Sequence, residues 1–147
     1  MKKLLIVLLL ITGGTVTSQV QEYKIITVVE SIVQGGIGRS RMIENKSEQD
    51  IDEFTTERTD GKKSDQGKIK RRDAKVDLFA ESKLLNFYSS TGINFRNIAS
   101  NDALISSKLS QMLEKGWELA FVIGGVEADS GIDDGAGIFI TRYIFKR

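Results

Sequence analysis

The chain is 147 residues long, and its 21 basic and 20 acidic side chains nearly balance. It contains no cysteine and no histidine, which excludes disulfide bonds, acid–base chemistry by imidazole, and typical zinc or copper sites. A chain of this length forms one domain whose core needs no covalent staples, and its bulk charge selects no class of partner.

The amino-terminal residues have the order of features that is typical of a cleavable export signal. Two lysines precede the apolar run Leu4–Ile11, and a stretch of small and polar residues follows up to Ser18. The apolar run is too short for a membrane anchor, which needs about 20 residues. We therefore expect cleavage between Ser18 and Gln19. Residues 19–147 would then form a periplasmic or secreted domain with no membrane span.

The exported part begins with a segment that is typical of an interior strand. Residues 22–33 are rich in β-branched side chains and apolar on both alternating faces, which predicts a strand covered on both sides. Gly35, Gly36 and Gly38 then precede a short return strand at 39–43, so a hairpin or bulged turn is expected. The glycine spacing matches neither common nucleotide-binding pattern, which disfavours a phosphate-binding loop.

Charge dominates residues 44–75, which cannot contribute to a core. The half up to Asp60 is mainly acidic and the half from Gly61 is mainly basic. Asp-Gly is a preferred pair for a type I′ turn, so one interpretation is a protruding charged hairpin with that turn at its tip. The other interpretation is a solvated loop. The basic run Lys68–Arg72 has no stacking aromatic residues beside it, so no nucleic-acid partner is expected.

A strand and then the clearest helix of the chain follow the charged segment. Residues 92–98 alternate apolar and polar side chains, which predicts a strand. The sequence from 102 to 115 predicts a helix that Ser100 or Asn101 caps, because apolar side chains recur on one stripe at the helical period. The residues of that stripe are Leu104, Ile105, Leu109, Met112 and Leu113. The stripe indicates that the helix packs on a sheet.

The residues after the helix predict a capping motif and two closing strands. Gly116 supplies the left-handed conformation that a helix end requires, and Trp117 then follows where an apolar contact back to Met112 is expected. In the strand 117–123, Trp117, Leu119, Phe121 and Ile123 are expected to share one face, and Gly124 and Gly125 to end it. The last strand, 138–145, places its aromatic side chains on one face and its isoleucines on the other. These elements predict an α+β fold with an antiparallel sheet of four to five strands and the helix 102–115 on one face.

Three short stretches resemble a family of very short bacterial proteins classed as a domain of unknown function. They are Tyr23-Lys24 at the opening of a strand, Leu113-Glu-Lys-Gly-Trp-Glu-Leu119 at the end of a helix, and Phe145-Lys-Arg147 at the end of the last strand. The resemblance covers residues 22–29 and 103–147. It implies a strand, a helix and two closing strands, but no reaction and no catalytic residue.

An acidic loop is the candidate metal site of the sequence. Glu127, Asp129, Asp133 and Asp134 lie in a glycine-containing segment, and hard oxygen ligands on such a backbone suit Ca²⁺. Their spacing differs from the EF-hand pattern, so a solvated acidic loop is the competing interpretation.

The sequence favours a binding function over catalysis. Each catalytic pattern considered fails its spacing requirement, and no cofactor is expected. We therefore expect a non-enzymatic envelope or secreted module that binds a protein or a small ligand. The alternatives are a carboxylate-based hydrolase and a Ca²⁺-binding module that uses the acidic loop.

Overall fold

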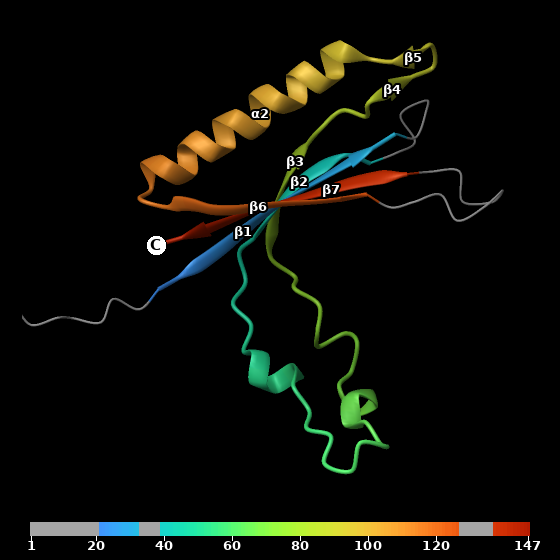
Figure 1. The fold of residues 1–147 in the computed structure, drawn as a ribbon, viewed down its shortest axis with the longest axis vertical. Helices are drawn as coiled ribbons and strands as arrows, with labels where there is room; N and C mark the ends of the chain where they lie inside the picture. The colour runs from blue at the N-terminus through green and yellow to red at the C-terminus, as the bar shows by residue number, and fades with distance from the viewer. Residues whose placement is uncertain (1–20, 33–38, 127–136) are drawn as a thin grey trace, which may run out of the picture.

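The computed structural model describes residues 21–32, 39–126 and 137–147, which form an antiparallel sheet with one long helix on it (Figure 1). The strand order of the five-stranded sheet is β3-β2-β1-β7-β6, and β4 and β5 form a separate two-stranded sheet. The elements are β1 (Tyr23–Ser31), β2 (Arg41–Asn45), β3 (Phe79–Lys83), β4 (Tyr88–Ser89), β5 (Gly92–Ile93), α2 (Phe95–Glu114), β6 (Glu118–Val126) and β7 (Ile138–Lys146). The predicted α+β class is confirmed.

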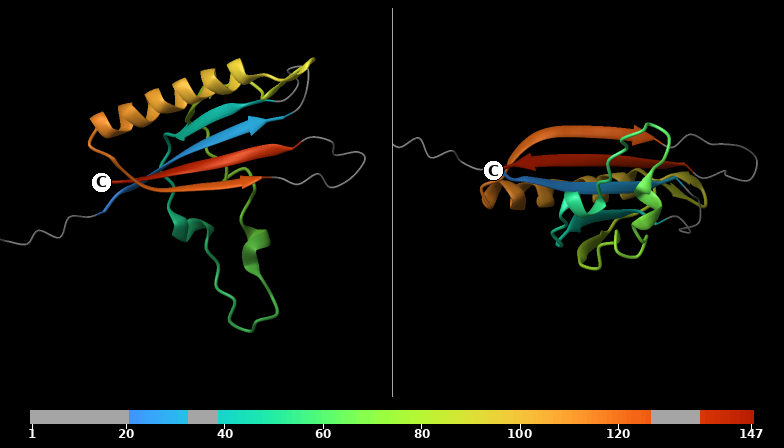
Figure 2. Two further views of the ribbon diagram at one scale, coloured as in Figure 1. Left: turned by 45° about the horizontal axis from the view of Figure 1, so that its top comes forward. Right: turned by 90° about the horizontal axis from the view of Figure 1, so that it is seen from below.

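Strand β1 is the central strand of the sheet, but only one of its faces is covered. The side chains of Ile26 and Val28 lie under α2 and are 1% exposed. On the opposite face Tyr23 is 58% exposed and Ile25 is 47% exposed. The expectation of cover on both faces is therefore wrong for the described residues, because their one α-helix, α2, lies on one side of the sheet (Figure 2).

Helix α2 begins seven residues earlier than its apolar stripe predicts. The side chain of Asn94 accepts hydrogen bonds from the backbone N–H groups of Arg96 and Asn97, at 3.1 and 3.2 Å, and so caps a helix that starts at Phe95. The predicted strand at 92–98 is therefore wrong beyond Ile93, since this cap is stronger than a short alternation of apolar residues. Asn101, expected as a cap, is instead fully buried within the helix.

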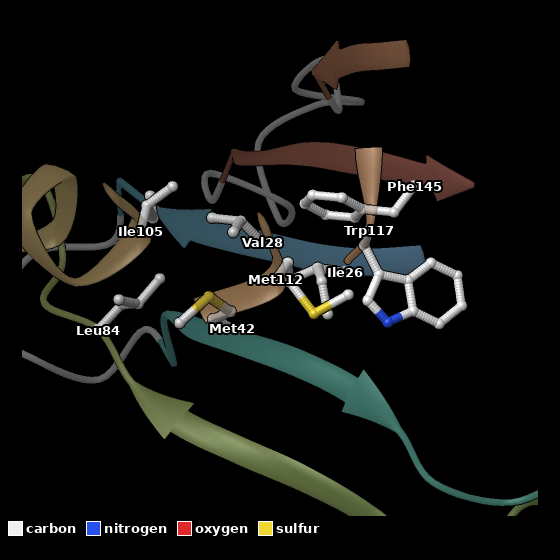
Figure 3. Close-up of a cluster of buried hydrophobic side chains, with 8 residues drawn as sticks. All are labelled: Ile26, Val28, Met42, Leu84, Ile105, Met112, Trp117 and Phe145. Carbon is white, nitrogen blue, oxygen red and sulfur yellow. The ribbon is translucent and has the colours of Figure 1, made fainter. Parts of the chain in front are cut away.

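The core lies between α2 and one face of the sheet, and the helical stripe that reaches it is narrower than expected. Ile105 and Met112 are buried and Leu109 packs against them, whereas Leu104 is 45% exposed and Leu113 is 56% exposed. Figure 3 shows the buried cluster, which consists of Ile26, Val28, Met42, Leu84, Ile105, Met112, Trp117 and Phe145. None of these residues belongs to β6.

The end of α2 has the hydrogen bonds of a Schellman motif. Gly116 has a φ angle of 79°, and its N–H group donates to the carbonyl oxygen of Leu113 at 2.9 Å. The N–H group of Trp117 donates to the carbonyl oxygen of Met112 at 3.1 Å. The indole of Trp117 then lies beside Met112 in the core (Figure 3). This motif turns the chain from the helix directly into β6.

Strand β6 is longer and less regular than predicted. Gly124 and Gly125 do not end it, since it continues to Val126. An irregularity in its pairing with β7 between Leu119 and Phe121 shifts the alternation, so these two side chains do not share a face. A period-two pattern cannot reveal such a bulge.

The charged segment forms an irregular arm, residues 46–78, which projects from the sheet on the side away from α2 (Figures 1 and 2). It contains two short 3-10 helices, Ile51–Phe54 and Asp65–Lys68, and no strand ladder. The side chain of Asp60 accepts hydrogen bonds from the N–H groups of Lys62 and Lys63. The backbone of Asp60 does not have the positive φ angle that a type I′ turn requires. The hairpin with a type I′ turn is therefore wrong, because side chains rather than a facing strand satisfy the backbone here.

Candidate functional site: the open face of the sheet

The sheet face opposite α2, called here the open face, carries a broad set of exposed apolar side chains. Side chains alternate between the two faces of a strand, so the neighbours of buried Ile26 and Val28 point to this face. The strand register places the partners of these neighbours on it as well. Its residues include Tyr23, Ile25, Thr27, Ile43, Phe121, Ile123, Ile140, Arg142 and Ile144. Among the residues that the structure describes, the one α-helix, α2, lies on the other face of the sheet (Figure 2).

Two grooves lie on the open face. The larger has a volume of about 600 Å³, and Ile25, Thr27 and Ile43 belong to its lining. The beginning of the charged arm, Lys46 to Glu48, also lines it. The smaller groove has a volume of about 270 Å³ and is lined by residues of β6 and β7. Both grooves are open, so they suit an extended segment or a small ligand that lies along the sheet.

Arg142 lines both grooves and is the cation between them. It lies on β7, paired with Thr27 of β1 on one side and with Ile123 of β6 on the other. Within the described part of the chain, no side chain forms an ion pair or hydrogen bond with its guanidinium group. Its five N–H donors are therefore available to a carboxylate or a similar acceptor.

The buried carboxylate of Glu44 holds two lysines, Lys24 and Lys46, that line the larger groove. Glu44 is 5% exposed, and the ammonium groups of Lys24 and Lys46 both lie 2.7 Å from its Oε1 atom. The ammonium group of Lys108, on α2, contacts Oε2. Burial by itself would raise the pKa of Glu44, but the hydrogen bonds from the three lysines outweigh burial and hold that pKa well below 4.5. The cluster joins β1, β2, α2 and the arm.

Trp117 makes cation–π contacts with two basic side chains near the Glu44 cluster, those of Lys24 and Arg147. The Lys24 ammonium lies 5.9 Å from the centroid of its ring, and the Arg147 guanidinium carbon lies 4.6 Å from it. Arg147 also pairs with Glu22 at 2.6 Å. These contacts fix the chain end next to the buried cluster, so Trp117 has a structural role in packing.

The residues singled out by sequence reasoning and those brought together by the fold are largely different. The candidate Ca²⁺ ligands Glu127, Asp129, Asp133 and Asp134 lie outside the described residues, as do the glycines between β1 and β2. In residues 21–32, 39–126 and 137–147, no three His, Cys, Asp or Glu side chains gather into a possible metal site.

Sequence reasoning missed Arg142 and the Glu44 cluster. Two features of the sequence could have revealed them. Arg142 alternates with Ile140 and Ile144 in β7, and Glu44 follows Met42 by two positions, so it points to the same face of β2 as that buried residue.

The described helices include none with both the length and the apolar character needed to cross a membrane. The resemblance to the family of short bacterial proteins remains a prediction. In comparisons with known proteins, no family model, no curated protein and no solved structure matches this chain.

Proposed function

We propose that the chain is an exported, non-enzymatic binding module whose open face receives an apolar ligand or protein segment that carries a carboxylate. The observation that supports this proposal is the position of Arg142, which lies between two grooves on an uncovered apolar sheet face without a charged partner in the described structure.

The shape and chemistry of the larger groove fit such a ligand. Binding sites for small molecules have volumes of about 300–1,000 Å³ and combine an apolar lining with a few oriented polar groups. Here Ile25 and Ile43 supply apolar surface. Lys24 and Lys46 are already held by Glu44, so Arg142 is the cation left to bind an anionic group. A guanidinium group binds carboxylates by two parallel hydrogen bonds, which orients the ligand.

The geometry favours binding over the carboxylate-based hydrolase. Hydrolysis by two carboxylates requires both to flank the bond that is cleaved, one as the acid and the other as the base or nucleophile. The carboxylates that line the larger groove are Glu22 and Glu48, and Glu22 is paired with Arg147. The groove is open along the sheet, as a binding surface requires.

Decanoate, which has an apolar chain and one carboxylate, tests the proposed binding mode. We expect the purified protein to bind decanoate in isothermal titration calorimetry, and the substitution Arg142→Gln to weaken binding about tenfold, the loss expected for one charge-assisted hydrogen-bonded pair. Arg96→Gln, which changes an exposed arginine on α2, is the matched control and should leave the affinity unchanged.

Decanol, the neutral analogue, separates carboxylate recognition from apolar burial. Its binding should be equally weak in the unmodified protein and in Arg142→Gln. Equal decanoate affinities for Arg142→Gln and Arg96→Gln would refute the role of Arg142.

Export is tested by the amino terminus of the protein recovered from the envelope of bacterial cells that express the full chain. Sequencing should begin at Gln19 because residues 1–18 have the features of a cleaved signal. Leu8→Arg places a charge in the apolar run and should retain the uncleaved chain in the cytoplasm. Recovery of envelope protein that begins at Met1 would contradict this prediction.

A further inference from the structure

Strand β6 is an edge strand with an unusual amount of exposed apolar surface. It has one neighbour, β7, in the described part of the chain, so the backbone groups on its other side have no strand partner there. It is nine residues long, and Glu118 is its only charged residue. Long, apolar and uncharged edges are where sheets pair with another chain.

Both faces of β6 are also exposed. Phe121 and Ile123 point to the open face and are 62% and 54% exposed. Val122 and Val126 point to the α2 side, but they lie beyond the cover of the helix and are 53% and 63% exposed. A strand that is apolar on both faces is typical of a strand whose two faces are both covered, so the exposed apolar side chains of β6 favour contact with another chain.

The other edge of the sheet, β3, has the opposite character. It is five residues long and carries Glu81 and Lys83. Charged side chains and short length are features that protect an edge strand from pairing. Pairing between β3 of one copy and β6 of the next would also leave free edges and build open-ended assemblies. The contrast points to β6 pairing with itself.

We propose that two copies of the chain pair antiparallel through β6, about a two-fold axis at Val122, and form one continuous ten-stranded sheet. In this register Phe121 of one copy lies opposite Ile123 of the other on the open face, an aromatic and β-branched pair that stabilises strand pairing. Glu118 lies opposite Val126, so no like charges face each other. A second copy therefore complements both the backbone edge and the charge pattern.

Pairing through β6 would join the open faces of the two copies into one surface. The smaller groove, which Ile123 and Arg142 line, would then lie next to its symmetry mate. This inference does not depend on carboxylate binding by Arg142, since it rests on the edge and the faces of β6.

Sedimentation of the protein purified without detergent tests the assembly. We expect a dimer at micromolar concentration, and we expect Val122→Lys to convert it to a monomer, because the two new lysines face each other across the axis. The control is Ile51→Lys on the arm, where the side chain is 75% exposed, and it should remain a dimer. Circular dichroism must show that both variants keep the fold.

A single cysteine tests the register, since the chain has no cysteine of its own. Residues that face each other in an antiparallel pair have Cα atoms about 4.5–5.5 Å apart, which a disulfide can span. Val122→Cys should therefore yield a cross-linked dimer on mild oxidation, whereas Ile51→Cys should not. A monomer at 100 micromolar, open-ended filaments, or no cross-link at position 122 would overturn the proposal.

Discussion

Glu44→Gln should lower the free energy of unfolding by about 3 kcal/mol, because it leaves three lysine ammonium groups without their shared anion. Breaking a buried ion pair by removing one partner costs about 3–5 kcal/mol. We expect the lower end of that range, since Lys24 and Lys46 are partly exposed and can regain water. Glutamine keeps the volume of the side chain, so the loss reports the charge rather than a cavity. Urea denaturation at pH 7 measures it.

The same variant should change how stability depends on pH. The pKa of Glu44 in the folded protein lies below the value of 4.5 expected in the unfolded chain. Above pH 4.5 the carboxylate is ionised in both states and its stabilisation is fully present. As the pH falls below 4.5 the unfolded chain takes up a proton first, so this stabilisation is progressively lost.

Unfolding measured between pH 7 and pH 3 checks this dependence. Glu44→Gln should show a smaller acid-induced loss of stability than the unmodified protein. Glu81→Gln, on the exposed β3, is the matched control and should change stability by less than about 0.5 kcal/mol at pH 7. Parallel pH profiles for the unmodified protein and Glu44→Gln would contradict the assigned role.

The sequence predicted the α+β class because its elements carry local signals. The apolar stripe from Ile105 to Met112 and the glycine after the helix each indicate a structure through a few neighbouring residues. The start of α2 was missed because Asn94 and the alternating residues around it give competing local signals. The bulge in β6 was missed because it depends on pairing with β7, which is a property of the folded sheet.

The candidate site was predictable only in its general class. Whether the second face of β1 is covered depends on how many helices pack on the sheet. The apolar pattern of β1 is compatible both with a covered and with an exposed second face, so it does not predict which occurs. The Glu44 cluster joins residues that lie up to 84 positions apart, from Lys24 to Lys108, so no local window reveals it. Arg142 lies between two grooves because it pairs with Thr27 of β1 and with Ile123 of β6, and neither of these residues is close to it in the sequence.

Asn101→Ala should also destabilise the fold by about 3 kcal/mol. The buried side chain of Asn101 forms hydrogen bonds with both backbone groups of Leu85, as a neighbouring strand would. Its amide oxygen accepts from the N–H group of Leu85, and its amide nitrogen donates to the carbonyl oxygen of Leu85, each at 2.8 Å. The nitrogen also donates to Glu30 at 2.8 Å. Each buried polar group left unsatisfied costs about 1–3 kcal/mol. Thermal and urea unfolding measure the loss.

Asn97→Ala is the matched control, one helical turn earlier. The side chain of Asn97 donates one hydrogen bond, to the carbonyl oxygen of Asn86 at 2.8 Å, and is only partly buried, so its loss should cost about 1 kcal/mol. Both substitutions exchange asparagine for alanine in the same helix, a change of less than about 1 kcal/mol in helix propensity, so a difference of about 2 kcal/mol between them reports the contacts. Hydrogen exchange adds a local measure, since the Leu85 amide should lose protection in Asn101→Ala and keep it in Asn97→Ala. Unchanged protection of Leu85 in both variants would show that Asn101 does not hold the β3–β4 connection to the helix.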